Sequence, residues 1–159
     1  MIKVGETIPS IPIRQVTNSG PREVNAYDIF AGKRSILFAV PGAFTPVCST
    51  KHLPGFLTYA PALQQKSIQQ IACLAVNDAF VLQAWAEDLQ VYNKILMLAD
   101  GNASLTKAMG LTLDLTNFGM GIRSQRYTMV IQDGIIEHLE IEPAGTCHLT
   151  SAEHILEKL

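Results

Sequence analysis

The residue with the clearest chemical potential is Cys48, which closes the stretch Val40–Cys48 (VPGAFTPVC). Thr45 followed by Pro46 is typical of a helix N-cap and a first helical residue. Cys48 then falls at the third helical position, where unpaired backbone N–H groups and the helix dipole favour the reactive thiolate. A helix end contributes only about 0.3–1 kcal/mol to an anion. A reactive Cys48 therefore needs a second cation, and an arginine elsewhere in the chain is the residue to look for. The alternative is that Cys48 is a small buried hydrophobic residue.

The four residues Thr45-Pro46-Val47-Cys48 stand where a dithiol exchanger carries Cys-x-x-Cys at a helix start. A hydroxyl replaces the first thiol, which excludes two-cysteine disulfide exchange at this motif. The Thr45 hydroxyl can form a hydrogen bond to a substrate beside the sulfur, or it can cap the helix, and both are compatible.

The chain has three cysteines and four histidines. Cys73 lies in an apolar segment typical of a buried strand, whereas Cys147 lies in a segment that we expect to be an exposed loop before the last helix. The histidines show no metal-ligand spacing with cysteines or carboxylates, so we expect no metal site. These histidines are His52, His138, His148 and His154.

The elements that must position Cys48 form a strand–helix order. Ser35–Val40 is a short apolar run that predicts a strand buried on both faces, and its carboxyl end is where α/β folds place their ligands. Gln132-Asp133-Gly134 between two apolar runs predicts a hairpin, and Pro54 should kink the helix that begins near Pro46. The other expected elements are an extended segment at 7–13, a turn at 18–21, a helical turn at 25–30, strands at 68–76 and 95–98, helices at 79–89, 103–109 and 151–159, and hairpin strands at 126–131 and 135–141. This order predicts an α/β, thioredoxin-like fold with a mixed central sheet flanked by helices, formed by residues 1–159 as a single domain.

Composition narrows the possible partners. Lys plus Arg is 12 and Asp plus Glu is 14, so there is no basic excess for nucleic acid. No apolar run approaches the roughly 18 residues of a membrane helix, and the N-terminus lacks the apolar core of a signal peptide. We therefore expect a cytoplasmic protein with neither a nucleic-acid nor a membrane partner. Only 16% of residues are charged, which favours self-association. Phe44, Phe80 and Trp85 are candidates for that interface or for the core.

The stretch Pro41–Phe56 (PGAFTPVCSTKHLPGF) resembles the active-site signature of peroxiredoxins of the type-five subfamily. It contains the family's Pro-x-x-x-Thr-x-x-Cys and the subfamily's His-Leu-Pro-Gly-Phe. The resemblance continues through Cys73–Val81, Met97–Asn102 and Gly121–Tyr127 and covers essentially the whole chain.

This resemblance implies a thiol-dependent peroxidase that reduces hydrogen peroxide and alkyl hydroperoxides and serves antioxidant defence. Cys48 would be the peroxidatic cysteine, oxidised to a sulfenic acid, and no metal or organic cofactor would be required. Thr45 would align the peroxide, and Pro41 would help to wall the pocket. Arg126 matches the family's active-site arginine, and Arg123 is a nearby but weaker candidate.

The resemblance also bears on how the sulfenic acid is reduced. Cys73 matches a cysteine common in the subfamily, and it is either a resolving cysteine or an inert core thiol. Cys147 lies near the C-terminal resolving cysteine of some relatives, and we hypothesise that it forms a disulfide with Cys48 after local unfolding. Otherwise glutathione with glutaredoxin, or thioredoxin, would act as the external reductant. A homodimer packed around the active-site end is expected, and a binding or chaperone protein on the same fold is the competing interpretation.

Overall fold

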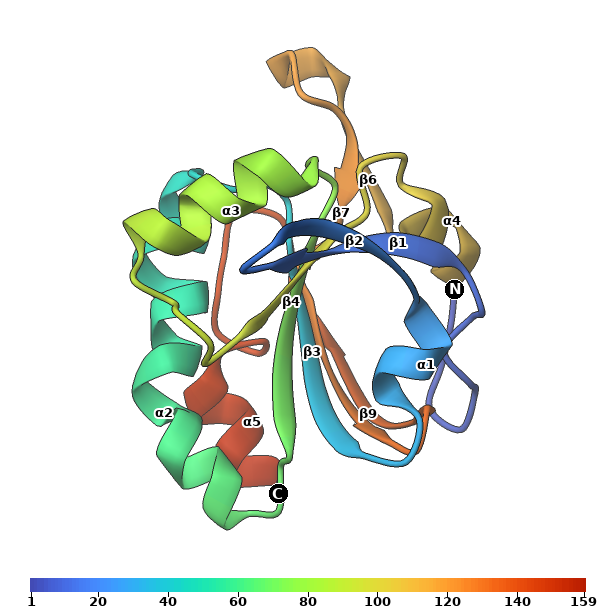
Figure 1. Cartoon of the computed structure of the whole chain (residues 1–159), viewed down its shortest axis with the longest axis vertical. Coiled ribbons are helices and arrows are strands. Elements are labelled where there is room, and N and C mark those ends of the chain that lie inside the picture. The colour runs from blue at the N-terminus through green and yellow to red at the C-terminus, as the bar shows by residue number, and fades with distance from the viewer.

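The computed structural model describes all 159 residues and is built around a seven-stranded sheet in the order β2-β1-β5-β4-β3-β8-β9 (Figure 1). The strands of this sheet are β1 (Pro12–Thr17), β2 (Gly20–Asn25), β3 (Arg34–Val40), β4 (Gln70–Ala75), β5 (Leu96–Ala99), β8 (Tyr127–Gln132) and β9 (Ile135–Ile141). Strand β4 pairs in parallel with β3 and β5, whereas β8 pairs antiparallel with β3. The sheet is therefore mixed, which confirms the predicted thioredoxin-like α/β fold.

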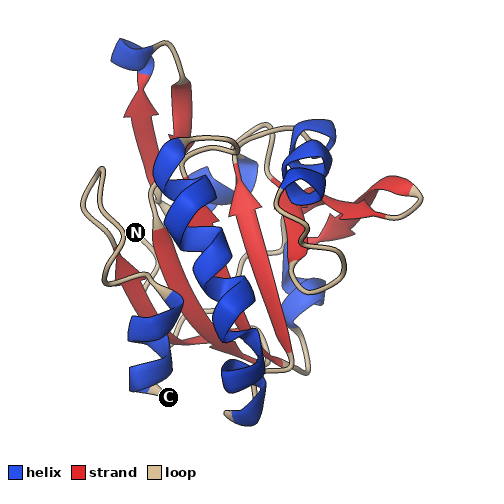
Figure 2. Cartoon of the chain, turned by 90° about the vertical axis from the view of Figure 1, so that its left-hand side faces the viewer, coloured by secondary structure: helices blue, strands red, loops and turns tan.

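Helices cover both faces of the sheet and create two separate cores (Figures 1 and 2). The helices are α1 (Ala26–Phe30), α2 (Leu53–Gln65), α3 (Ala79–Asp88), α4 (Ser104–Met109) and α5 (Ala152–Lys158). Side chains of α2, α3 and α5 contribute to one core, and those of α1 and α4 contribute to the other. None of the helices combines the length and apolar character needed to cross a membrane.

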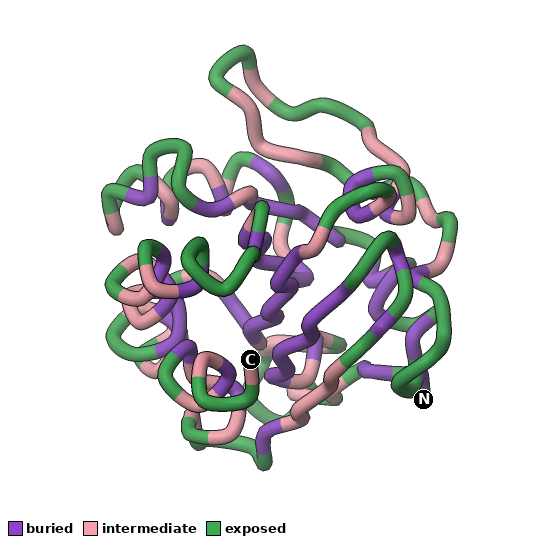
Figure 3. The backbone as a smooth tube through the Cα atoms, turned by 90° about the horizontal axis from the view of Figure 1, so that it is seen from below, coloured by how far each residue is buried: buried purple, intermediate pink, exposed green.

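Strand β3 lies at the centre of this arrangement. Ile36, Phe38 and Val40 pack into the core beneath α2, whereas Leu37 and Ala39 pack into the opposite core. All five are fully buried, which is why the segment is an uninterrupted apolar run. Figure 3 shows the same pattern along the whole backbone, where buried stretches run through the middle and exposed ones follow the outer turns. The prediction of a strand buried on both faces is confirmed.

Most turns and helix starts form where their residue types predicted them. The Asp78 side chain accepts a hydrogen bond from the Val81 amide at the start of α3. At the hairpin between β8 and β9, Asp133 has φ 50° and Gly134 has φ 77°, as a tight two-residue turn requires. The Ser151 side chain caps α5 by accepting from an amide of its first turn.

Two parts of the fold were not predicted from the sequence. One is the antiparallel pair of β1 and β2, where only an extended segment at 7–13 and a turn at 18–21 were expected, and the other is a short arm. Strands β6 (Thr112–Leu115) and β7 (Gly121–Ser124) pair antiparallel and are joined by the 3-10 turn η2 (Thr116–Phe118). This arm projects from the main sheet (Figure 1), and its Phe118 is 77% exposed. Both strands have only four residues and most of those are exposed or half-buried, so no buried face produced a recognisable alternation.

Candidate active site

Cys48 lies at the carboxyl end of β3, at the point where the chain turns into a helix. Pro46 and Val47 are the first helical residues, so Cys48 occupies the predicted third position. Cys48 also begins η1 (Cys48–His52), a widened π-helical segment that leads into α2. Its carbonyl accepts the amide of the residue five positions later, and this widening immediately precedes Pro54, which has no N–H to donate. The predicted irregularity at Pro54 therefore takes the form of a π turn, a feature common at functional sites.

The sequence had suggested that the Thr45 side chain caps the helix, but in the structure it does not. Its Oγ1 instead donates a hydrogen bond to the Gly42 carbonyl at 2.7 Å. The Ala43 amide donates to Asn77 Oδ1 at 3.0 Å, which ties the same loop to the segment before α3. Two tethers thus fix the loop that precedes Cys48, and the lone pairs of the Thr45 hydroxyl remain able to accept a bond from a bound molecule.

A pocket of about 460 Å³ opens beside this loop. Its wall comes from the loop after β3, the β6–β7 arm, the residues before β8 and the loop after β9. The lining residues are Pro41, Thr45, Pro46, Val47, Leu113, Leu115, Met120, Gln125, Arg126, Glu142, Pro143, Ala144 and Gly145. The structure therefore brings Pro41, Thr45 and Arg126 together at one pocket, as the resemblance implied. The sequence did not predict that the β6–β7 arm and residues Glu142–Gly145 would also line this pocket.

Arg126 connects the pocket to the buried Cys48. One guanidinium nitrogen, Nη2, donates to Cys48 Sγ at 3.0 Å, and Arg126 is only 7% exposed. A buried guanidinium can form a charge-assisted hydrogen bond with a thiolate, which makes Arg126 the candidate for the second cation. Arg123 forms no hydrogen bond with Cys48: its Nε donates to the Met120 carbonyl at 2.9 Å, and its Nη1 lies against Gly42 in the loop before Cys48. Geometry therefore separates the two candidate arginines.

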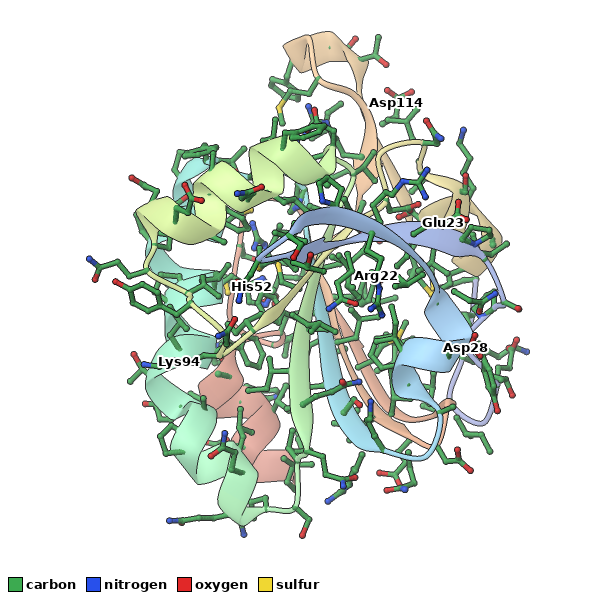
Figure 4. All side chains as sticks on the ribbon, in the orientation of Figure 1. Arg22, Glu23, Asp28, His52, Lys94 and Asp114 are labelled. Atoms are coloured by element: carbon green, nitrogen blue, oxygen red, sulfur yellow. The ribbon has the colours of Figure 1, made fainter.

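His52 occupies the other side of the same guanidinium. Its Nδ1 lies 2.8 Å from Arg126 Nη1, and its Nε2 lies 3.0 Å from the Thr150 carbonyl oxygen. Burial, together with the positive charge of Arg126, lowers the pKa of His52 to about 3, and the bond to Thr150 offsets only part of this. The ring is therefore neutral near pH 7. Figure 4 shows His52 in the interior, between α2 and the central strands.

The sequence placed His52 at the start of the His-Leu-Pro-Gly-Phe part of the signature and gave it no role of its own, and we missed its contact with Arg126. The available signal was its position one helical turn after Cys48, which places both side chains on one face of the helix.

The two remaining cysteines occupy different environments. Cys73 is fully buried in β4, opposite Phe38, as expected for a core thiol. Burial raises the pKa of Cys73 well above its usual value, and the proximity of Cys48 adds to this increase. Cys147 lies between β9 and α5 and is half-buried rather than exposed, which corrects the sequence expectation. Burial also raises the pKa of Cys147, although the charge of Arg126 opposes the change.

Glu142 holds the loop that carries Cys147. Its Oε1 accepts hydrogen bonds from the His148 amide and from both the amide and the hydroxyl of Thr150. Burial alone would raise the pKa of Glu142, but these hydrogen bonds outweigh burial and keep the pKa below its usual value. The carboxylate is therefore a fixed anchor for this loop at neutral pH.

The three aromatic candidates for an interface separate into two groups. Trp85 is fully buried, and its Nε1 donates to the hydroxyl of Ser49, the residue after Cys48, at 2.9 Å. Phe44 is 52% exposed and Phe80 is 71% exposed, so neither is a core residue. Of the three aromatic residues, only Trp85 is therefore part of the core.

Comparison with known proteins gives one consistent family. The Redoxin family model matches residues 3–156. The chain is 43% identical over 162 residues to "Peroxiredoxin-2E, chloroplastic" of Arabidopsis thaliana, covering 99% of this chain and 69% of that protein. The structure of reduced Prx3 from Vibrio vulnificus in complex with H2O2 is 46% identical with a TM-score of 0.95, covering 99% of both chains. Peroxiredoxin 5 from Alvinella pompejana is 34% identical with a TM-score of 0.87, covering 99% of this chain and 97% of that one.

Proposed function

The chain belongs to the Redoxin family and is a peroxiredoxin, a thiol-dependent peroxidase with an antioxidant function, and from this we propose that Cys48 is its peroxidatic cysteine and Pro41, Thr45 and Arg126 complete the active site. The observation that carries the assignment is the 3.0 Å bond from Arg126 to Cys48 Sγ beneath the pocket.

The reaction is a two-electron displacement at the O–O bond. The Cys48 thiolate attacks the terminal oxygen of ROOH, an S–O bond forms, and the O–O bond breaks. Sulfur becomes a sulfenic acid, and the leaving RO⁻ takes a proton to become ROH. Arg126 donates to the sulfur before attack and to the peroxide oxygens as negative charge moves onto them. The Thr45 hydroxyl lies in the pocket lining, where it can accept a hydrogen bond from the peroxide O–H and align the O–O bond.

Hydrogen peroxide and alkyl hydroperoxides are the proposed substrates. The similar Vibrio vulnificus protein binds H2O2 in its crystal structure, which supports the first. The pocket here offers both apolar and polar lining residues, which suits a small alkyl group beside the O–O bond.

A stoichiometric experiment tests the assignment. One equivalent of hydrogen peroxide is added to the reduced protein, free thiols are alkylated, and mass spectrometry locates the oxidised cysteine. We expect Cys48 to be oxidised within seconds and the Cys48→Ser variant to consume no peroxide. Oxidation of Cys73 or Cys147 with Cys48 left intact would contradict the assignment.

Recycling of the sulfenic acid is proposed to use Cys147. Its thiol attacks the Cys48 sulfur, a disulfide forms, and the sulfenic oxygen leaves as water. Cys147 lies on a loop and is half-buried, whereas Cys73 is enclosed in a central strand, and this difference supports Cys147. A disulfide requires the two Cα atoms to lie within about 7 Å of each other. A Cys48–Cys147 disulfide in peroxide-treated protein would support the proposal. A Cys48–Cys73 disulfide would contradict it and identify Cys73 as the resolving cysteine.

The external electron donor is proposed to be glutathione with glutaredoxin, or thioredoxin. Either supplies the thiols that reduce a Cys48–Cys147 disulfide or, without that disulfide, the sulfenic acid itself. Peroxide-dependent NADPH oxidation, measured with each complete reducing system in turn, distinguishes the two donors.

We also propose a homodimer, supported by the exposed side chains of Phe44 and Phe80 near the active-site end of the sheet. Light scattering at micromolar concentration should give twice the monomer mass, and Phe80→Ser should lower it. A cytoplasmic location, where free thiols stay reduced, is likewise proposed and is testable by cell fractionation.

A further inference from the structure

His52 and Cys48 bind opposite branches of one guanidinium group. Arg126 Nη1 contacts His52 Nδ1 at 2.8 Å, and Nη2 contacts Cys48 Sγ at 3.0 Å. A guanidinium is planar and rigid, so holding one branch fixes the direction of the other. We propose that His52 is a positioning residue that aims Arg126 at the Cys48 sulfur by presenting a neutral, unprotonated Nδ1, with the Thr150 carbonyl fixing that tautomer. This inference rests on the proposed role of Cys48.

The Thr150 carbonyl determines which ring nitrogen carries hydrogen. A carbonyl oxygen can only accept, so His52 Nε2, at 3.0 Å, must be the donor. Nδ1 then has a free lone pair, the only arrangement that lets it accept from Arg126. The Thr128 hydroxyl also donates to the Thr150 carbonyl, at 2.7 Å, which holds the acceptor in place.

The ring has little freedom to leave this position. His52 is fully buried, and its ring centroid lies 4.8 Å from that of Phe38 and 5.7 Å from that of Phe56. These aromatic walls leave Nδ1 and Nε2 as the polar contacts of the side chain. The imidazole is therefore a rigid spacer between Arg126 and the backbone at Thr150.

A neutral partner is chemically important for Arg126. None of the protein's ion pairs involves Arg126, although a carboxylate is the usual partner of a buried arginine. A carboxylate would draw the positive charge away from the sulfur. An uncharged nitrogen acceptor orients the guanidinium and leaves its full charge to act on Cys48 and on the peroxide.

Two amide substitutions separate the two nitrogen contacts. In His52→Asn, the side-chain oxygen can occupy the position of Nδ1 and accept from Arg126. In His52→Gln, the longer side chain reaches the position of Nε2 and the Thr150 carbonyl, and Arg126 Nη1 loses its acceptor. We expect the Cys48 oxidation rate to fall at least tenfold in His52→Gln and less than threefold in His52→Asn.

The rate is measured by stopped-flow fluorescence of Trp85, the only tryptophan. Its indole N–H donates a hydrogen bond to Ser49, the residue after Cys48, so its emission should report on Cys48. A second readout is the pH profile of Cys48 alkylation. It should move to higher pH in His52→Gln and stay in place in His52→Asn, a difference that a loss of packing alone does not produce. Circular dichroism and thermal unfolding verify that each variant is folded.

The Arg126→Met background completes the test. If His52 acts through Arg126, then His52→Gln slows the Arg126→Met protein less than twofold further. Equal losses in His52→Asn and His52→Gln, or an undiminished effect of His52→Gln in Arg126→Met, would overturn the inference. A folded His52→Asn protein that loses tenfold would overturn it even if His52→Gln fails to fold. Failure of wild-type Cys48 to react would instead refute the proposed function.

Discussion

Replacing Arg126 with Met removes the guanidinium but keeps a long apolar stem that fills most of the space. The substitution deletes the 3.0 Å bond to Cys48 Sγ, in a site where Arg126 is 7% exposed and water cannot replace it. A hydrogen bond to a charged group is worth about 1.5–3 kcal/mol. At about 1.4 kcal/mol per tenfold change, the rate of Cys48 oxidation should fall roughly 10- to 150-fold. The oxidation rate of Arg126→Lys should lie between those of the wild type and Arg126→Met, because a single ammonium group cannot hold both His52 and Cys48 as a forked guanidinium does.

Single-turnover oxidation by hydrogen peroxide, followed through Trp85 fluorescence and checked by mass spectrometry of Cys48, measures this loss. Arg123→Met is the matched control, since Arg123 lies close in sequence but donates to the Met120 carbonyl. It should retain the wild-type rate within a factor of two. Equal losses in the two variants would refute the assignment of Arg126, and an unchanged rate in Arg126→Met would refute the requirement for a second cation.

Three further predictions concern individual side chains. The pKa of His52 is lowered from 6.5 to about 3, so the unfolded chain binds a proton there that the folded chain does not, and the free energy of unfolding falls as pH drops below 6.5. Between pH 6.5 and 5 the free energy of unfolding should fall by at most about 2 kcal/mol. Urea denaturation should show this fall in the wild type, and the fall should be absent in His52→Asn. Thr45→Val should slow Cys48 oxidation about tenfold, the scale of one lost hydrogen bond, while Thr45→Ser should retain most of the rate, both measured by stopped flow. Gly134→Ala should lower the free energy of unfolding by about 2–4 kcal/mol in urea denaturation, because φ is +77° and the new Cβ would lie 2.6 Å from Tyr27.

The fold was predictable where local patterns coincide with burial. The apolar run of β3, the Asp133-Gly134 turn and the starts of α3 and α5 each depend on neighbouring residues, so the sequence was sufficient to locate them. The β6–β7 arm was missed because its strands are short and largely unburied, and the burial of Cys147 was missed because Glu142 orders its loop through contacts between side chain and backbone.

For the active site, the sequence by itself determined the position of Cys48 at a helix start and the need for a second cation. The resemblance already favoured Arg126 over Arg123, and the tertiary structure added the bond from Arg126 to Cys48. Only the tertiary structure showed that Thr45 bonds to Gly42 and that His52 contacts Arg126. The reason is that the deciding contacts are nonlocal: Arg126 lies 78 residues from Cys48 and 74 from His52 along the chain. Such contacts depend on the pairing of β8 with β3, and no local periodicity encodes the direction of a guanidinium.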